Sequence, residues 1–331
     1  MTIRQVAAAA GVSRATASRV ISASPLVSHQ ARQAVEKAID DLGFVPSAAA
    51  RSLALGKSRT VALILPEPDS RVLTDPFFAS TILGLSAQLE ASDMQMVLLI
   101  ARSGQGTGRI FRFVEGGHVD GAVIASHHRD DFLNQSVLDS SLPCAFIGRP
   151  LGVDVPAMYV DMDNRQGARL ATEHLIATGW QRIATIAGPS DMSAGIDRLE
   201  GWRDAVRAAG RPDSAIAYGD FTIDGGMGAA RQLLSTNPDL DAVFVASDMM
   251  AVGALTELGN QGRRVPQDVA VIGFDNFELG QSTTPPLSTV DHPVGEMAAK
   301  AGQMLLDVLA GGEPHLDPVL FAPHLVLRNS A

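Results

Sequence analysis

The chain has 331 residues, of which 46% are hydrophobic and 19% charged, so it is long enough for two or three globular domains. Its one cysteine, Cys144, excludes an intrachain disulfide. No apolar run approaches the roughly 20 residues of a membrane-spanning helix or resembles a signal peptide, so we expect a cytoplasmic protein without a membrane partner.

The charge of the chain is distributed unevenly. The net charge of −10 argues, by itself, against a nucleic-acid partner. Residues 1–59, however, hold eight basic and three acidic residues, a net of +5, which leaves −15 for the rest. A small basic head on a large acidic body is expected when only the head meets phosphate groups, although a short basic N-terminus also arises by chance.

Three short helices are predicted in the basic head. Thr2 and Gln5 fit a capping box for the first helix, Ser13 can cap a second over residues 14–22, and Ser28 can cap a third. The joint between the first two helices is about three residues long and contains a glycine. This is the spacing of a helix-turn-helix, whose second helix enters the major groove, although a generic three-helix bundle has the same periodicity.

The second helix carries side chains suited to DNA near its start and on its outer face, namely Arg14, Ala15, Ser18 and Arg19. The surrounding pattern closely resembles the N-terminal signature of the LacI-GalR repressors: Thr2-Ile3-x-x-Val6-Ala7-x-x-Ala10-Gly11-Val12-Ser13-x-Ala15-Thr16-x-Ser18-Arg19-Val20. The resemblance implies that Arg14, Ala15 and Arg19 read bases and that Thr16 and Ser18 approach the backbone. The predicted DNA contacts of the head are Thr2, Ser13, Arg14, Ala15, Thr16, Ser18, Arg19 and Ser28.

A short helix is also predicted after Pro46, over residues 47–56. About nine residues form only a marginal helix in isolation, so we expect this segment to fold when a partner packs on it; a plain linker is the alternative. The pattern Ala50-Arg51-x-Leu53 resembles the hinge helix of the same family. The resemblance implies that paired hinge helices insert Leu53 into the minor groove and kink the operator, with Arg51 contacting the backbone or supporting the hinge.

From Thr60 onward, short apolar runs alternate with amphipathic segments, which predicts parallel sheets covered by helices on both faces. The predicted strands are Val61–Leu65, Met96–Ala101, Gly121–Ala125, Cys144–Ile147, Ile183–Ala187, Ala242–Ala246 and Val269–Gly273. The predicted fold is therefore an N-terminal all-α helix-turn-helix head with a hinge helix, followed by an α/β body of two doubly wound subdomains. The predicted boundaries are 1–46 for the head, 47–59 for the hinge and linker, and 60–331 for the body. Within the body, the first subdomain takes about 60–160 and 291–320, and the second about 161–290 and 321–331.

Ligands of open parallel sheets bind beyond the carboxyl ends of the strands. That rule nominates the segments Pro66–Phe78, Ser126–His128, Gly148–Arg149, Gly188–Arg198, Ser247–Asp248 and Phe274–Asn276. They offer charged groups and flat apolar faces, a combination that suits a small polar metabolite. The predicted effector contacts are Phe77, Phe78, Arg149, Arg198, Phe221, Ser247 and Asp275.

The body also resembles the same family and, like it, the periplasmic sugar-binding proteins. The matching motifs are Asp161-x-Asp163-Asn164, Arg198-x-x-Gly201-Trp202, Ser247-Asp248-x-Met250-Ala251 and Ile272-Gly273-Phe274-Asp275-Asn276. The resemblance implies that Arg198 and Asp275 grip the effector, whereas Ser247 stands where the family often has asparagine. A sugar or sugar derivative is the expected effector, and a nucleoside or purine is the alternative.

Several polar residues also have purely structural interpretations. Asp248 follows a strand and precedes a helix, as a helix N-cap does. Asp161 and Asp163 fit a loop, and Gly104-x-Gly106-x-Gly108 fits a turn because it lacks the spacing of a phosphate-binding loop. His127 and His128 have no companion at metal-ligand spacing, so we expect a cleft-edge loop and neither a metal nor a cofactor.

These observations together predict a transcriptional repressor that is not an enzyme. Its expected partners are a palindromic double-stranded DNA operator, a small-molecule effector and a second copy of the chain, and we expect effector binding to release the operator. An enzyme on the same fold would need an activated nucleophile or an acid–base pair, and no spacing identifies one. A transport-type binding protein would not need the basic head. No heptad extension follows Leu327, which favours a homodimer over a tetramer.

Overall fold

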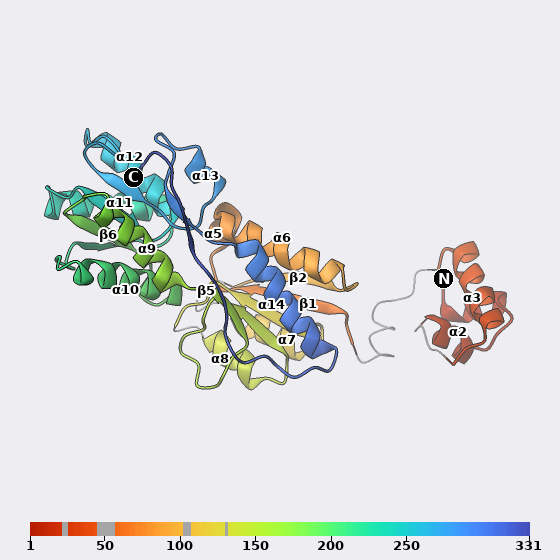
Figure 1. Cartoon of the computed structure of the whole chain (residues 1–331). Coiled ribbons are helices and arrows are strands. Elements are labelled where there is room, and N and C mark those ends of the chain that lie inside the picture. Colours follow the sequence, from red (N-terminus) through yellow and green to blue (C-terminus); the bar gives the residue numbers. More distant parts are fainter. Residues whose placement is uncertain (22–25, 45–56, 102–106, 130–131) are drawn as a thin grey trace. The chain divides into compact units, whose positions relative to one another are not determined.

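The structure is a computed structural model that describes residues 1–21, 26–44, 57–101, 107–129 and 132–331 (Figure 1). The predicted hinge helix, with Arg51 and Leu53, lies outside the described residues, as do Gly104 and Gly106 of the predicted turn. Gly108, the third glycine of that pattern, lies in a helix and not in a turn. No helix within the described ranges is long and apolar enough to cross a membrane.

The N-terminal region is a bundle of three helices, α1 (Ile3–Ala9), α2 (Arg14–Ile21) and α3 (His29–Leu42). They meet around Val6, Ala17, Val20 and Val35, which are buried because the apolar residues of each helix recur every three or four positions. The predicted caps are confirmed at the second and third helices. The hydroxyl oxygen of Ser13 accepts a hydrogen bond from the amide of Thr16 at 3.0 Å, and that of Ser28 accepts one from Ala31 at 3.3 Å.

The first sheet of the body has the strand order β11-β5-β4-β3-β1-β2. Its strands are β1 (Thr60–Leu65), β2 (Gln95–Ile100), β3 (Gly121–Ala125), β4 (Cys144–Ile147), β5 (Tyr159–Met162) and β11 (Val319–Phe321). Every residue of β3 is buried, as expected for a parallel strand with helices on both faces. Helices α6 (Pro76–Glu90) and α14 (Val294–Leu309) pack together on one face, and α7 (Thr107–Glu115) and α8 (Phe132–Asp139) contact one another on the other (Figure 1).

The second sheet has the order β7-β6-β8-β9, and all its strand pairs are parallel. Its strands are β6 (Ile183–Ala187), β7 (Ile216–Tyr218), β8 (Ala242–Val245) and β9 (Ala270–Ile272). Two helix pairs enclose it, α9 (Asn164–Ala177) with α10 (Ser193–Ala208), and α11 (Ile223–Thr236) with α12 (Asp248–Asn260) (Figure 1). This alternation confirms the predicted doubly wound α/β body.

The remaining elements are short. Helix α5 (Asp69–Thr74) follows β1, and helix α13 (Glu278–Gln281) follows β9. Strands β10 (Thr289–Asp291) and β12 (His324–Val326) form an antiparallel pair of their own. The chain end then joins the second sheet, where the amide of Val271 donates a hydrogen bond to the carbonyl of Ser330 at 2.8 Å. The last residues are therefore part of the body's core.

Candidate functional site

A cavity that is partly open to solvent lies at the carboxyl ends of the strands of both sheets, and the empty space in it and in its opening is about 690 Å³. The first sheet contributes Asp161 near the end of β5, and the segments that follow its strands contribute Arg71, Asp75, Phe77, His127 and Asn164. Those that follow the strands of the second sheet contribute Arg198, Phe221, Ser247 and Asp275. The cavity therefore lies where the rule for open parallel sheets places a ligand.

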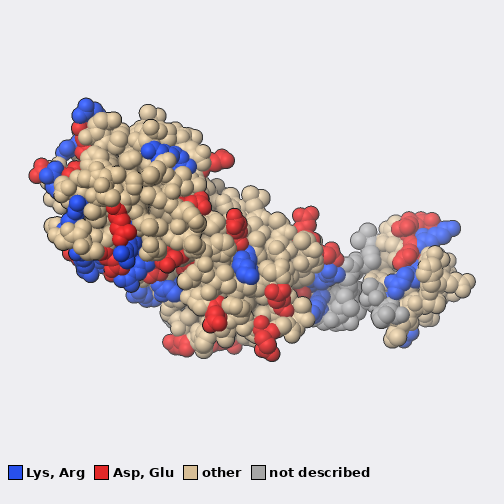
Figure 2. All heavy atoms as spheres, in the orientation of Figure 1, with Lys and Arg blue, Asp and Glu red and all other residues tan. Residues whose placement is uncertain are grey.

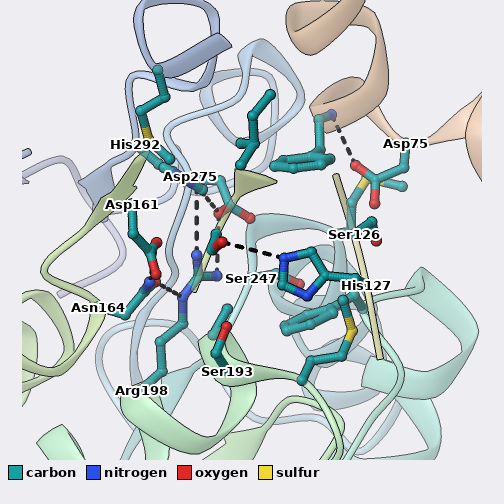
Figure 3. A pocket seen from close by; sticks show the side chains of 18 of the residues that line it. Asp75, Ser126, His127, Asp161, Asn164, Ser193, Arg198, Ser247, Asp275 and His292 are labelled. Atoms are coloured by element: carbon teal, nitrogen blue, oxygen red, sulfur yellow. Dashed lines mark hydrogen bonds and ion pairs between the residues drawn. The ribbon is translucent and has the colours of Figure 1, made fainter. Parts of the chain in front are cut away.

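Arg198 is the central charged group of this cavity (Figure 3). Its side chain is almost fully buried, and its Nε donates to Asn164 Oδ1 at 2.8 Å. Its Nη1 donates to the carbonyl of Ala246 at 2.7 Å and to Asp275 Oδ1 at 3.2 Å. Burial lowers the pKa of the guanidinium, and the Asp275 carboxylate opposes that effect. The Arg198 guanidinium also lies 3.6 Å from the ring centre of Phe274, a cation–π contact that replaces some of the lost hydration.

Asp275 is held in a backbone conformation that few side chains adopt. Its φ is 115°, and that of Asn276 is 60°. The Asn276 side chain donates to Asp291 at 2.7 Å and accepts from Arg328 at 2.6 Å, so segments near both ends of the β10–β12 pair fix this turn. His292 Nδ1 lies 3.1 Å from Asp275 Oδ1. A strained backbone of this kind persists only where several surrounding contacts hold it in place, and such strain is common at ligand sites.

Of the three phenylalanines predicted as flat walls of the cavity, two line it and one does not. Phe77 and Phe221 line the cavity, and the Arg71 guanidinium lies 5.7 Å from the Phe221 ring centre. Phe78 does not line the cavity: it is fully buried in the core and packs edge-on against Phe77, with 5.2 Å between ring centres. Neighbours on a helix point about 100° apart, so α6 turns only one of the two rings toward the cavity.

Arg149 also lies outside the residues that line the cavity. Its Nη2 donates to both carboxylate oxygens of Asp197 on α10, at 2.8 and 2.7 Å. Its backbone amide donates to Asp161 Oδ2 at 2.9 Å, and Asp161 does line the cavity. The guanidinium of Arg149 thus pairs with a carboxylate of α10, and its contribution to the cavity is through its backbone.

Serine, and not aspartate, caps helix α12. The Ser247 hydroxyl accepts from the amide of Met250 at 3.2 Å, so the interpretation of Asp248 as the N-cap is wrong by one residue. Asp248 is buried behind the cavity, where its carboxylate accepts from Thr289 at 2.7 Å and from the amide of Phe277 at 2.9 Å. Burial, followed by the nearby Asp275 carboxylate, raises the pKa of Asp248 to about 8.

Six polar residues that line the cavity were not among the predicted effector contacts: Arg71, Asp75, His127, Asp161, Asn164 and His292. The segments nominated by the strand-end rule did include Arg71, Asp75 and His127. Asp75 caps α6 by accepting from the amide of Phe77 at 3.0 Å, and burial raises its pKa to about 6. Burial also raises the pKa of Asp161. Position was the available signal for His127, which lies two residues after β3 at the carboxyl edge of the first sheet. It was not available for Asp161, because β5 was not predicted.

The predicted DNA contacts lie on the three-helix bundle. Arg14, Ala15 and Arg19 are exposed on α2, whereas Thr16 and Ser18 are half-buried. The amide of Thr2 donates to Gln5 Oε1 at 2.8 Å, the arrangement expected of a capping box. Because Ser13 and Ser28 already cap helices, any phosphate contact of these residues would be additional to a structural role.

The acidic body carries charges of both signs on its surface. Figure 2 shows Lys and Arg interspersed with Asp and Glu over the visible face of the body, without a large area of one sign. Many of these side chains are paired, as in the bridges Arg165–Asp204 and Arg264–Asp268. That face offers no basic stripe for phosphate groups, in contrast to the basic excess of residues 1–59.

Comparison with known proteins matches both parts of the chain. Residues 2–47 match the family described as bacterial regulatory proteins, lacI family, and residues 172–331 match the periplasmic binding protein-like domain. The HTH-type transcriptional regulator CelR of Thermobifida fusca is 44% identical over 99% of this chain and 98% of its own length. The HTH-type transcriptional repressor CytR of Escherichia coli K12 is 33% identical over 99% of this chain and 96% of its own.

Solved structures give the same result. A CelR–cellobiose complex superposes with a TM-score of 0.81 at 43% identity and covers 100% of both chains. The lac repressor dimer bound to operator and the anti-inducer ONPF superposes with a TM-score of 0.87 at 26% identity, over 100% of this chain and 98% of that one. The chain therefore belongs to the LacI family of bacterial transcriptional regulators, with a helix-turn-helix head and a periplasmic-binding-protein-like α/β body.

Proposed function

We propose that this regulator is a cytoplasmic homodimeric repressor, that its two heads bind a palindromic operator, and that a sugar bound in the cavity releases it. In the head, Arg14, Ala15 and Arg19 are the proposed base-reading residues. In the cavity, the proposed sugar contacts are Phe77, Arg198, Phe221, Ser247 and Asp275. The cytoplasm follows from the operator, because chromosomal DNA is the partner.

The buried Arg198–Asp275 pair is the observation that supports the sugar assignment most directly. It presents a guanidinium donor and a carboxylate acceptor side by side, and a sugar hydroxyl can accept from one and donate to the other. Phe77 and Phe221 add flat apolar faces for the carbon side of a ring. Cellobiose is the first sugar to test, because the similar CelR was solved with it.

The proposed mechanism couples the cavity to the hinge. A ligand that contacts residues following both sheets favours one arrangement of the two sheets over another, and that difference changes whether two hinge helices can pair on DNA. Coupling of this kind is typically about 1–3 kcal/mol, or roughly 5–150-fold in affinity, and it is reciprocal. The operator should therefore weaken sugar binding by the same factor as the sugar weakens operator binding.

The test is fluorescence anisotropy with a library of palindromic duplexes at two salt concentrations. Each titration is repeated with cellobiose, glucose, ribose, cytidine and adenosine. We expect tight, salt-dependent binding to one palindrome, because phosphate contacts release counterions, and we expect cellobiose to weaken it. Binding no tighter than to random DNA would contradict the repressor, and release by a nucleoside alone would contradict the sugar.

The role proposed for Leu53 has a separate test. Leu53→Ala should reduce specific operator binding and DNA bending while leaving weak nonspecific binding in place, because only the kinked complex uses the wedge. Leu55→Ala, two residues further along the same predicted helix, is the matched control. Equal loss of specific and nonspecific affinity in Leu53→Ala would contradict the wedge.

A further inference from the structure

Two nitrogens in the cavity wall lack a hydrogen-bond partner. Among the described residues, the buried side-chain polar atoms without a partner include Arg71 Nε and His127 Nδ1, and both residues line the cavity. Others, such as Trp202 Nε1, belong to residues away from it. Arg71 Nε still has Asp75 Oδ2 at 3.9 Å, within ion-pair distance. An unpaired buried polar atom destabilises a folded protein, so His127 Nδ1 is the atom for which a ligand would supply the partner.

The contacts of His127 determine which hydrogen-bonding role its free nitrogen can play. His127 Nε2 lies 3.2 Å from the carbonyl oxygen of Gly148, and a carbonyl can only accept. Nε2 must therefore carry the hydrogen, which leaves Nδ1 of the neutral ring as a bare acceptor. Burial lowers the pKa of His127 to about 4, so the ring is neutral at physiological pH. Nδ1 can then accept a hydrogen bond and cannot donate one.

The orientation of the ring is fixed by its neighbours. The His127 ring packs edge-to-face against Phe146, with 5.5 Å between ring centres and 87° between planes. Gly148, which supplies the carbonyl, has φ +91°, a conformation that side chains rarely adopt. His127 itself is only 3% exposed. The acceptor is therefore held in place before a ligand arrives, so that little ordering is needed on binding.

We propose that His127 is a specificity-determining residue of the cavity, whose Nδ1 accepts a hydrogen bond from one hydroxyl of the bound sugar. This inference rests on the proposed function and goes further by assigning a direction to one contact. Figure 3 shows His127 across the cavity from Asn164 and Arg198. His127 follows β3, whereas Asn164 begins α9 and Arg198 lies in α10. A ligand that reaches both sides contacts residues following both sheets.

The direction of this hydrogen bond selects between ligands. A hydroxyl can donate to Nδ1, whereas a fully ionised phosphate, a carboxylate or a ring ether offers only acceptors and would face the lone pair unpaired. The two guanidinium groups of the cavity add to this selection, because both already pair with carboxylates, Arg71 with Glu67 at 2.6 Å and Arg198 with Asp275 at 3.2 Å. The cavity should therefore prefer a sugar whose hydroxyl at this contact is free to the ester that carries a phosphate at the same position.

The experiment uses the full-length protein and the tightest-binding member of the sugar and nucleoside panel, which we expect to be cellobiose. That compound and its monodeoxy derivatives, each lacking one hydroxyl, are titrated calorimetrically into the wild type, His127→Phe and His127→Asn. Phenylalanine keeps a ring against Phe146 but has no acceptor. We expect His127→Phe to bind the parent compound about tenfold more weakly. His127→Asn should recover part of that loss, because its amide oxygen can replace Nδ1.

The monodeoxy series separates a direct contact from a structural role. One derivative should bind the wild type and His127→Phe equally, because it lacks the hydroxyl that donates to Nδ1. If His127→Phe weakens every derivative by the same factor, or weakens none, the proposed contact is wrong. The control is His315→Phe, the same substitution in an exposed loop of the body, which should leave all affinities unchanged. A wild type that binds operator but no member of the panel would instead overturn the proposed function and this inference with it.

Discussion

Two adjacent histidines, His127 and His128, carry different charges because one lies in the wall of the cavity and the other at its edge, which we call the rim. In the wall, His127 is buried, neutral and short of one partner. At the rim, Nδ1 of His128 lies 2.7 Å from Asp191 and its Nε2 lies 3.2 Å from Glu67. The hydrogen bond with Glu67 contributes most to raising the pKa of His128 to about 9, with Asp191 adding to it and burial opposing it. Position in the fold, and not residue type, sets the charge of each ring.

The difference also concerns which parts of the body are joined. We define the rim as the two bridges His128–Asp191 and Arg149–Asp197. His128 and Arg149 follow β3 and β4 of the first sheet, whereas Asp191 and Asp197 follow β6 of the second sheet, Asp197 within α10. The rim therefore links segments that follow the two sheets through partly exposed ion pairs. The wall links them through buried groups. Substitutions should accordingly have large effects in the wall and moderate, pH- or salt-dependent effects at the rim.

The largest effect is expected from Arg198→Met. It leaves the buried Asp275 carboxylate without its counter-charge and removes donors from Asn164 and the Ala246 carbonyl. Breaking a buried pair in this way costs about 3–5 kcal/mol, and we expect sugar binding to become undetectable. Denaturant unfolding and calorimetric titration measure the two effects. Adding Asp275→Asn should restore part of the stability, because the uncompensated charge is removed.

Arg165→Met is the matched control for this prediction. Arg165 pairs with Asp204 at 2.6 Å, but its side chain is 57% exposed, so the loss should stay below about 1 kcal/mol. If Arg198→Met and Arg165→Met lowered the unfolding free energy by similar amounts, burial would not explain a difference between ion pairs in the cavity wall and ion pairs on the surface.

A moderate, pH-dependent effect is expected from His128→Gln. The folded state raises the pKa of His128 from its ordinary 6.5 to about 9, so the folded protein holds this proton more tightly than the unfolded chain. The resulting stabilisation is fully present below about pH 6.5 and is lost as the pH rises through 9. The wild type should exceed His128→Gln in unfolding free energy by about 1–3 kcal/mol at pH 6, and the difference should vanish near pH 10.

Denaturant unfolding of both proteins between pH 6 and pH 10 measures this difference. Glu67 and Asp191 face His128 from the two sides, and Arg71 pairs with Glu67. His315→Gln, in an exposed loop, controls for the loss of an unrelated histidine. A difference that does not depend on pH would show that the His128 bridge is held by packing and not by charge.

The strands that sequence predicts best are those whose burial makes them continuously apolar. The runs at β1, β3, β6 and β8 were visible for that reason, because both faces of each strand are covered. Strands β5, β7, β10, β11 and β12 are not among the strands predicted from the sequence. Each has only three or four residues, and β11 exists because Val319 pairs with Val160, far away in the chain. No local pattern encodes such a pairing.

The cavity could be predicted in position but only partly in composition. Chain order places Arg198 and Asp275 beyond strand ends, and both line the cavity. His292 follows β10, which was itself not predicted, and so its approach to Asp275 could not be foreseen. The pairing of Arg149 with Asp197 depends on how a loop after β4 meets α10, which is likewise a long-range property. Roles of individual residues in effector and DNA binding remain predictions.

The smallest effect is expected at the bridge between Arg149 and Asp197, whose side chains are 37% and 26% exposed. A double-mutant cycle of Arg149→Met and Asp197→Asn should give a coupling energy of about 0.2–1 kcal/mol in unfolding, and less at high salt. The same cycle in sugar titrations distinguishes a rim bridge from a direct contact. If Arg149 acts only through the bridge, both single variants and the double variant weaken binding by the same factor, about 2–5-fold. If Arg149 touches the sugar itself, Arg149→Met weakens binding far more than Asp197→Asn does, and Arg149 then belongs to the wall of the cavity and not to its rim.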